Sequence, residues 1–84
     1  MNITLKLFAS LTDFLPAQVR ASNQLALVVP TGTRVAEVIA AQALPEKMVH
    51  LVLVNGHYIP PADRSTRTLA EGDVLAIWPP IAGG

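Results

Sequence analysis

The residues best suited to chemistry are the last two, Gly83 and Gly84, which end the chain in a carboxylate with no side chain beside it. ATP can activate a carboxylate as an acyl adenylate, which a sulfur or nitrogen nucleophile then attacks. Because glycine lacks a Cβ, such an end can pass close to the walls of a narrow channel in another protein. An activated glycyl group also has no stereocentre to epimerise. On these two residues alone, a frayed terminus without function is the alternative interpretation.

A tail of six residues, Pro79 to Gly84, is predicted to carry this carboxylate away from a folded domain. Fully extended at ~3.3 Å per residue, it reaches roughly 20 Å. Pro79 and Pro80 have no amide donor and a restricted φ, so we expect them to end the preceding strand and stiffen the base of the tail. The sequence therefore divides into a domain, residues 1–78, and an extended, flexible tail, residues 79–84.

The composition excludes several classes of function. The 84 residues suit one small domain, and an apolar share of 51% can supply its core. Six basic and six acidic side chains cancel, so nucleic acid is not an expected partner. Without cysteine there is no disulfide, thiolate metal site or cysteine nucleophile. No apolar run spans a bilayer and no secretory leader is evident, so we expect a cytoplasmic protein without a membrane partner.

Alternation of apolar and polar residues predicts a first strand at residues 2–8, with Ile3, Leu5 and Leu7 on one face and Phe8 on the other. Residues 24–29 suit a second strand that forms a hairpin with the first. The connector is expected to hold a helical turn at residues 10–15, capped by Ser10.

One helix is predicted after the second strand. Thr33 is its expected N-cap, and Pro45 is expected to end it. Its apolar stripe has three- and four-residue spacing and consists of Val35, Val38, Ile39 and Ala43.

Residues 50–54 form an apolar strand, and Asn55-Gly56 is a strong hairpin signal because both turn positions favour positive φ. The predicted register groups Val52, Val54 and Ile59 on one face and leaves Leu51, Leu53 and Tyr58 on the other. A last strand at residues 74–78 directs Leu75 and Ile77 to one face and Val74, Ala76 and Trp78 to the opposite one.

This order of elements predicts an α+β domain with a β-grasp arrangement, in which one main helix packs across a mixed sheet of about five strands. The other face of the sheet is left open. Phe8, Leu53, Tyr58 and Trp78 are expected to gather there, and exposed apolar clusters usually mark interaction sites. A core position is the alternative for Trp78, although strand parity favours the interface.

The remaining polar residues give weaker signals. His50 and His57 have no nearby Asp, Glu or Cys to complete a ligand set, so no metal site is expected. Ser10 and Ser65 do not lie in a nucleophile elbow, which argues against an autonomous hydrolase. Arg64 and Arg67 are interpreted as solvated loop residues, with guidance of an acidic partner as the alternative.

Three stretches of the chain resemble the ubiquitin-like sulfur-carrier family, which includes the small subunit of molybdopterin synthase and the thiamine-pathway sulfur carrier. They are Lys6-Leu7-Phe8-Ala9, Val54-Asn55-Gly56, and Leu69-Ala70-Glu71-Gly72-Asp73 running through to Pro79-Pro80-Ile81-Ala82-Gly83-Gly84. The resemblance spans nearly the whole chain, and the Pro-Pro before the tail looks more like the molybdopterin branch.

The resemblance implies a β-grasp fold and a sulfur-donating chemistry at Gly84, with Gly83 giving clearance beside it. An E1-like adenylating enzyme would use ATP to activate Gly84, which would become a thiocarboxylate (1-thioglycine). No cofactor would be bound by the chain itself. In the molybdopterin branch the sulfur goes to a pterin precursor held by the large subunit of molybdopterin synthase, and a heterotetramer with that subunit is left open. The chain would thus be the non-catalytic small subunit of a transferase.

The same resemblance implies the partner-binding residues. Ile81 and Ala82 would anchor the tail in the partner's channel, next to Pro79 and Pro80, while the open-face residues form the docking surface. Three alternatives remain: a carrier for thiamine or another sulfur-containing metabolite, a protein modifier that forms an isopeptide bond through Gly84, and a non-covalent interaction module.

Overall fold

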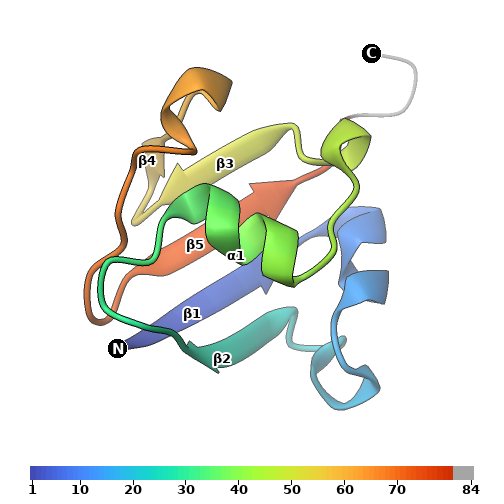
Figure 1. Ribbon diagram of the computed structural model, residues 1–84. Coiled ribbons are helices and arrows are strands. Elements are labelled where there is room, and N and C mark those ends of the chain that lie inside the picture. The colour runs from blue at the N-terminus through green and yellow to red at the C-terminus, as the bar shows by residue number, and fades with distance from the viewer. Residues whose placement is uncertain (81–84) are drawn as a thin grey trace.

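The computed structural model describes residues 1–80 of the chain and contains one five-stranded mixed sheet (Figure 1). The strands lie in the order β2-β1-β5-β3-β4. The neighbouring strands β1 and β5 are parallel, and every other pairing in this sheet is antiparallel. The strand bounds are β1 Asn2–Leu7, β2 Gln24–Val28, β3 Leu51–Val54, β4 His57–Tyr58 and β5 Val74–Trp78.

One α-helix, α1 (Val35–Ala41), crosses one face of this sheet, and the other face is left open (Figure 1). Four short 3-10 helices occupy the connections: η1 Ala9–Phe14, η2 Ala17–Val19, η3 Glu46–Met48 and η4 Pro61–Asp63. A mixed sheet covered by a single main helix is the predicted β-grasp fold, which is therefore confirmed. In the described part of the chain, no helix has the length and hydropathy needed to cross a bilayer.

The core lies between α1 and the sheet, and strand alternation places it correctly. Ile3, Leu5 and Leu7 of β1 are buried, as their period-two spacing predicts. The helix, β3, β5 and the residue after β4 contribute Val35, Val38, Val52, Val54, Leu75, Ile77 and Ile59, all of them buried. A single apolar cluster thus holds the helix on the sheet, and the predicted faces of β3 and β5 are confirmed.

The helical turn in the connector after β1 begins at a different residue from the one predicted. The 3-10 helix η1 begins at Ala9 and has Phe8 as its N-cap, so Ser10 is not the cap. Ala9 has φ of +52°, and the chain therefore turns sharply as soon as β1 ends. Leu11 and Leu15 are buried, which ties the connector to the core.

The helix α1 is also shorter than predicted. Arg34, not Thr33, is its N-cap, and the Glu37 carboxylate accepts the Arg34 N–H at 2.8 Å. The Thr33 hydroxyl instead donates to the Pro30 carbonyl at 2.7 Å and closes the preceding turn. The helix ends at Ala41, before the stripe reaches Ala43.

Ala43 does not join the apolar face of α1, because it is exposed and has φ of +55°. Its N–H donates to the Ala40 carbonyl at 3.0 Å, which ends the helix in a left-handed residue. The prediction that Pro45 sets the end of the helix is therefore wrong by several residues. Leu44, the residue after this turn, is buried in the core in place of Ala43.

The loop between β4 and β5 supports the start of α1. The N–H groups of Val35 and Ala36 donate to the carbonyls of Arg67 and Arg64, at 3.0 and 2.8 Å. These two helix donors have no partner inside the helix, so the loop satisfies them. The Arg34↔Thr68 bridge extends this contact.

Arg64 is not a freely solvated side chain, which corrects that interpretation. Its guanidinium donates to the backbone carbonyls of Ile59, Val49 and His50, at 3.3, 3.4 and 3.1 Å. A planar guanidinium can serve several carbonyls at once, and a lysine cannot do so in the same way. Arg67 is exposed, as expected for a loop arginine.

Candidate functional site

The base of the predicted tail lies at the end of β5, in the middle of the sheet. Trp78 is the last residue of this strand, and its carbonyl accepts the His50 N–H at 3.0 Å. Pro79 and Pro80 follow and have no N–H to continue the ladder, so the strand ends where predicted. Pro79 is half-buried and Pro80 is exposed.

The four predicted tail residues beyond this point, Ile81, Ala82, Gly83 and Gly84, lie outside the described residues. The division of the chain into a domain of residues 1–78 and a tail of residues 79–84 stays a prediction, although β5 ends at its boundary. Stiffening of the tail base by the two prolines stays a prediction as well.

An aromatic pair stands beside the base of the tail. The rings of Phe8 and Trp78 are stacked, with centroids 4.0 Å apart and an angle of 4° between their planes. The Phe8 N–H donates to the Ile77 carbonyl at 3.2 Å, so the backbone after β1 still follows β5. Both rings are half-buried. Trp78 is therefore a residue of the open face, and the core alternative is wrong.

The strand register connects this pair to the rest of the open face. Leu51 is paired with Trp78, and Leu53 is paired with Ala76 on one side and Tyr58 on the other. Cross-strand partners share a face of the sheet, so these side chains lie next to one another. Tyr58 is 54% exposed, whereas Ala76 is only 8% exposed. The open-face patch thus consists of Phe8, Leu51, Leu53, Tyr58, Ala76 and Trp78.

Four of these six residues are those that the sequence predicts as a cluster, and the structure brings them to one face. Leu51 and Ala76 were missing from the predicted docking surface. Strand parity already placed them on the correct face, and the register shows that they fill the space between the aromatic pair and Tyr58. Lys6, the register partner of Ala76, adds a half-buried cationic side chain to this face.

The two turn motifs of the resemblance meet at the opposite end of β5. The Asn55 amide donates from Nδ2 to Oδ1 of Asp73 at 2.8 Å, and its Oδ1 accepts the Val74 N–H at 2.9 Å. Asp73 is buried, and its second oxygen accepts the Ala70 N–H at 2.8 Å. Asn55 has φ of +50°, a conformation that asparagine tolerates better than most residues.

Glu71 extends this arrangement to the first strand, because its carboxylate accepts the Asn2 N–H at 3.0 Å. The Gly72 N–H in turn donates to the Asn2 carbonyl at 2.7 Å. The Asn55–Asp73 motif residues therefore position β5 against β1 and the β3–β4 hairpin. They act on the tail only by fixing the strand that bears it.

The imidazole side chains of the two histidines do not form part of this site, although the backbone of His50 contacts Trp78. His50 and His57 are both exposed, one before β3 and the other at the start of β4. Within residues 1–80, no group of three or more His, Cys, Asp or Glu side chains is placed to hold a metal ion.

Comparison with known proteins agrees with the fold and with the resemblance. The model of the ThiS family matches residues 5–84. A search of curated proteins gives no match. SAMP1 from Haloferax volcanii is a similar solved structure, with 26% identity and a TM-score of 0.67 over 100% of both chains.

Two further solved structures share the fold at lower identity. The thiamine biosynthesis protein ThiS from Geobacter metallireducens has 18% identity and a TM-score of 0.66 over 100% of both chains. A chain from the complex of subunits 1 and 2 of molybdopterin-converting factor from Helicobacter pylori 26695 has 18% identity and a TM-score of 0.62 over 100% of both. Since the family model covers all but the first four residues, the chain belongs to the ThiS family of ubiquitin-like sulfur carriers that its sequence resembles.

Proposed function

We propose that this chain carries sulfur as a thiocarboxylate on Gly84 and donates it for molybdopterin synthesis, as the small subunit of molybdopterin synthase. The Gly84 carboxylate attacks the α-phosphate of ATP and releases pyrophosphate. Hydrosulfide from a sulfur donor then attacks the acyl carbon, AMP leaves, and the product is 1-thioglycine. An E1-like enzyme supplies the ATP site and the catalytic groups, and the carrier supplies the acyl group.

The observation that supports this proposal most directly is the extent of the family match, which runs through the terminal glycine pair to residue 84. A match that ended at the last strand would support the fold but not the chemistry of the tail. The presence of two adjacent glycines at the end of the matched region favours the use of Gly84 as the reacting group and of Gly83 as the residue that gives it clearance.

The geometry at the base of the tail is consistent with delivery of Gly84 into a partner. Trp78 is held by the stacked Phe8 ring and by the His50 N–H, so residue 78 is fixed in the sheet. From there the six residues of the tail reach roughly 20 Å when extended. A partner can therefore bind the globular domain at its surface while its reaction centre lies well inside.

We assign the docking of partners to the open-face patch together with Pro79, Pro80, Ile81 and Ala82. The patch combines two aromatic rings with leucine side chains, and Tyr58 adds an exposed ring with a polar end. Tryptophan and tyrosine supply much of the binding energy at protein interfaces. Its position next to the tail base lets one partner hold the patch and the tail at the same time.

The molybdopterin pathway is preferred to the thiamine pathway because of Pro79-Pro80, which resembles the molybdopterin branch. The Helicobacter pylori complex contains a chain of this fold bound to a second subunit, and we propose an equivalent partner, the large subunit of molybdopterin synthase, here. A heterotetramer of two small and two large subunits is one assembly to test.

Intact mass spectrometry tests the carrier chemistry. The chain is incubated with the cognate activating enzyme, ATP and a sulfur donor, and fragmentation then locates any replacement of oxygen by sulfur. We expect the exchange at Gly84 alone and no exchange in a variant lacking Gly84. Absence of the exchange with an enzyme that binds the chain would refute the carrier function. Transfer of the sulfur to a pterin precursor, and not to a thiazole precursor, tests the choice of pathway.

Protein modification is the second candidate, favoured by the 26% identity to SAMP1 over the full length of both chains. In that case a lysine amine attacks the activated Gly84 and forms an isopeptide bond. Tagged chain recovered from cells under denaturing conditions would carry covalent adducts whose tryptic peptides contain a lysine branched with residues 68–84, because Arg67 is the last tryptic site of the chain. A carrier that acts only through its thiocarboxylate gives no such adducts.

A further inference from the structure

The free edge of β2 has backbone groups that point away from the sheet. The Leu7 N–H donates to the Asn23 carbonyl at 3.1 Å, and the Val29 N–H donates to the Met1 carbonyl at 2.9 Å. In an antiparallel ladder these bonding pairs alternate with non-bonding pairs. The N–H and C=O groups of Ala26 and Val28 therefore face outward, where no strand within residues 1–80 pairs with them.

This edge lacks the features that usually protect an outer strand. The sequence of β2, Gln-Leu-Ala-Leu-Val, contains no charge and no proline, and the Val28 side chain is 82% exposed. The opposite edge strand, β4, has only two residues and is followed by Ile59 and then Pro60-Pro61. A proline also follows β2, at Pro30, so strand length separates the two edges: β2 has five residues, and short edge strands resist pairing with other chains. Only the β2 edge is thus suited to accept an added strand.

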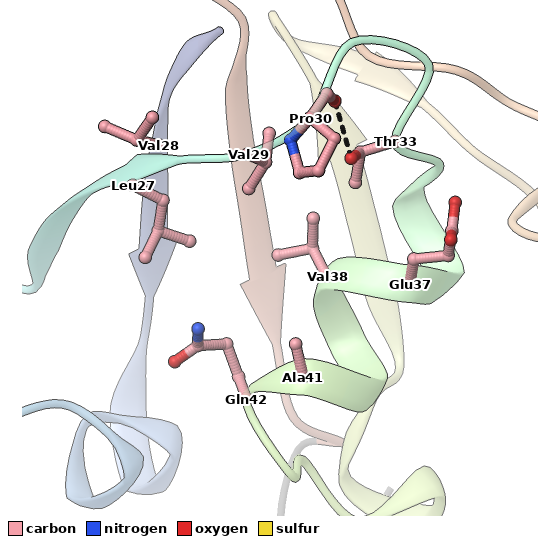
Figure 2. A pocket seen from close by; sticks show the side chains of 9 residues that line it. All are labelled: Leu27, Val28, Val29, Pro30, Thr33, Glu37, Val38, Ala41 and Gln42. Atoms are coloured by element: carbon pink, nitrogen blue, oxygen red, sulfur yellow. Dashed lines mark hydrogen bonds between the residues drawn. The ribbon is translucent and has the colours of Figure 1, made fainter.

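An apolar groove of about 350 Å³ runs between this edge and α1 (Figure 2). Leu27 extends from β2 toward it, and Val38 and Ala41 line it from the helix. Side chains alternate between the two faces of a strand. Every second side chain of a strand added to β2 would therefore lie over this groove, which selects aliphatic residues at those positions.

The charge of the groove favours a segment of another protein over a second copy of this chain as its occupant. Among the nine residues that line the groove, Glu37 is the only charged one, and it is exposed at the groove's margin. A segment with a Lys or Arg beside its aliphatic residues would complement this carboxylate. A second β2 strand has no basic residue to offer and would leave Glu37 unmatched.

We propose that β2 and the groove beside α1 bind an extended segment of a partner protein, with aliphatic side chains at alternate positions and a basic residue that meets Glu37. The segment adds a strand to the sheet through the backbone of Ala26 and Val28. This site is separated from the strand that bears the tail by β1, and it lies on the helix side of the sheet. It goes beyond the carrier function and leaves the open-face patch free.

The first test uses a synthetic peptide, acetyl-Lys-Ile-Thr-Val-Thr-Ile-Lys-amide, with the full chain labelled for NMR. At saturation we expect exchange of the Ala26 and Val28 amide hydrogens to slow by at least ~tenfold, because they gain partners. The amides of Leu25 and Leu27 already face β1, so their exchange should stay nearly constant. The matched control peptide, acetyl-Lys-Ile-Pro-Val-Pro-Ile-Lys-amide, keeps the charge and loses backbone donors, and should not bind.

Three variants test which residues of the groove contribute to peptide binding. Ala41→Phe fills the groove and should abolish peptide binding, whereas Ala40→Phe places the same ring on the other side of the helix and should not. Glu37→Gln should weaken binding by about two- to fivefold and remove its salt dependence, as expected for one exposed charge pair. Thermal denaturation of each variant verifies that the fold is intact.

Several outcomes would overturn the proposal. The first is an unchanged rate of amide hydrogen exchange at Ala26 and Val28 in millimolar peptide. The second is that the peptide changes NMR chemical shifts only in the open-face patch. The third is that exchange at Ala26 and Val28 slows with rising protein concentration in the absence of peptide, which would assign the edge to a second copy of the chain. Deletion of Gly84 should leave peptide binding intact, so failure of the carrier chemistry and failure of this site are distinguishable.

Discussion

Replacement of Asn55 by glycine should destabilise the domain without altering the chemistry of its tail. Glycine retains the positive φ that this position requires, so the substitution removes the side-chain hydrogen bonds and little else. The lost bonds are those to Oδ1 of Asp73 and from the N–H of Val74. Asp73 is buried and keeps only its bond from Ala70, so part of a buried carboxylate is left without a partner.

The size of the effect follows from these contacts. A hydrogen bond to a charged group contributes ~1.5–3 kcal/mol, and the exposed Val74 N–H can turn to water, so the loss should be about 2 kcal/mol. For a domain of this size, each kcal/mol shifts Tm by about 4–8 °C. Tm of Asn55→Gly should therefore fall by roughly 8–16 °C. Asn55→Ala should cost about 1 kcal/mol more, because alanine is strained at positive φ.

The assay is thermal and urea unfolding followed by circular dichroism, with sulfur loading of Gly84 measured by intact mass well below Tm. We expect lowered stability and normal loading, since the Asn55–Asp73 contact and the tail base lie at opposite ends of β5. In a double-mutant cycle with Asp73→Ala, the two effects should fall well short of additive. Additive effects, or a Tm within a few degrees of the wild type, would refute the account of this contact.

Substitutions at four other positions test the site and the fold. Trp78→Ala should weaken binding of the activating enzyme by at least ~tenfold in calorimetry, because it removes the largest ring of the patch; unchanged affinity would move the docking surface elsewhere. Arg64→Ala should lower the free energy of unfolding by ~1–3 kcal/mol, with only partial recovery in Arg64→Lys, because three carbonyls lose their donor. His50→Ala and His57→Ala should load sulfur normally, since both side chains are exposed, and a loss of loading in either would give that histidine a role.

The strands and their faces could be predicted because the evidence for them is local. Period-two alternation of apolar and polar residues identifies β1, short apolar runs identify β3 and β5, and Asn55-Gly56 fixes the register of the hairpin. Once the register is known, the open face follows from parity, and four residues of the patch were predicted this way. The wrong predictions concern two kinds of residue. Some have hydrogen-bond partners that are distant in sequence, and others follow a local pattern that a competing local interaction overrides.

Thr33 illustrates competition with a local pattern, because its hydroxyl is already bonded to Pro30 and the helix starts one residue later. Arg64 illustrates a distant partner, since two of the carbonyls that it serves belong to residues just before β3. A sequence gives no spacing rule for such contacts, so a loop arginine is assigned to solvent by default. Ala43 was assigned to the helix by spacing alone, whereas the left-handed turn there ends the helix.

The partnership of Phe8 and Trp78 depends on the one parallel pairing in the sheet. Leu7 and Ile77 are paired in register, and because β1 and β5 run in the same direction, the residues that follow both emerge at the same edge. An antiparallel pairing would place the end of one strand beside the start of the other. The first strand therefore helps to fix the base of the tail, although it lies at the other end of the sequence. Glu71 and Asp73 fix the opposite end of the same two strands. Contacts hold both ends of β5 and place Pro79 directly beside the open-face patch, so a partner that recognises the patch also determines where the remaining tail residues begin.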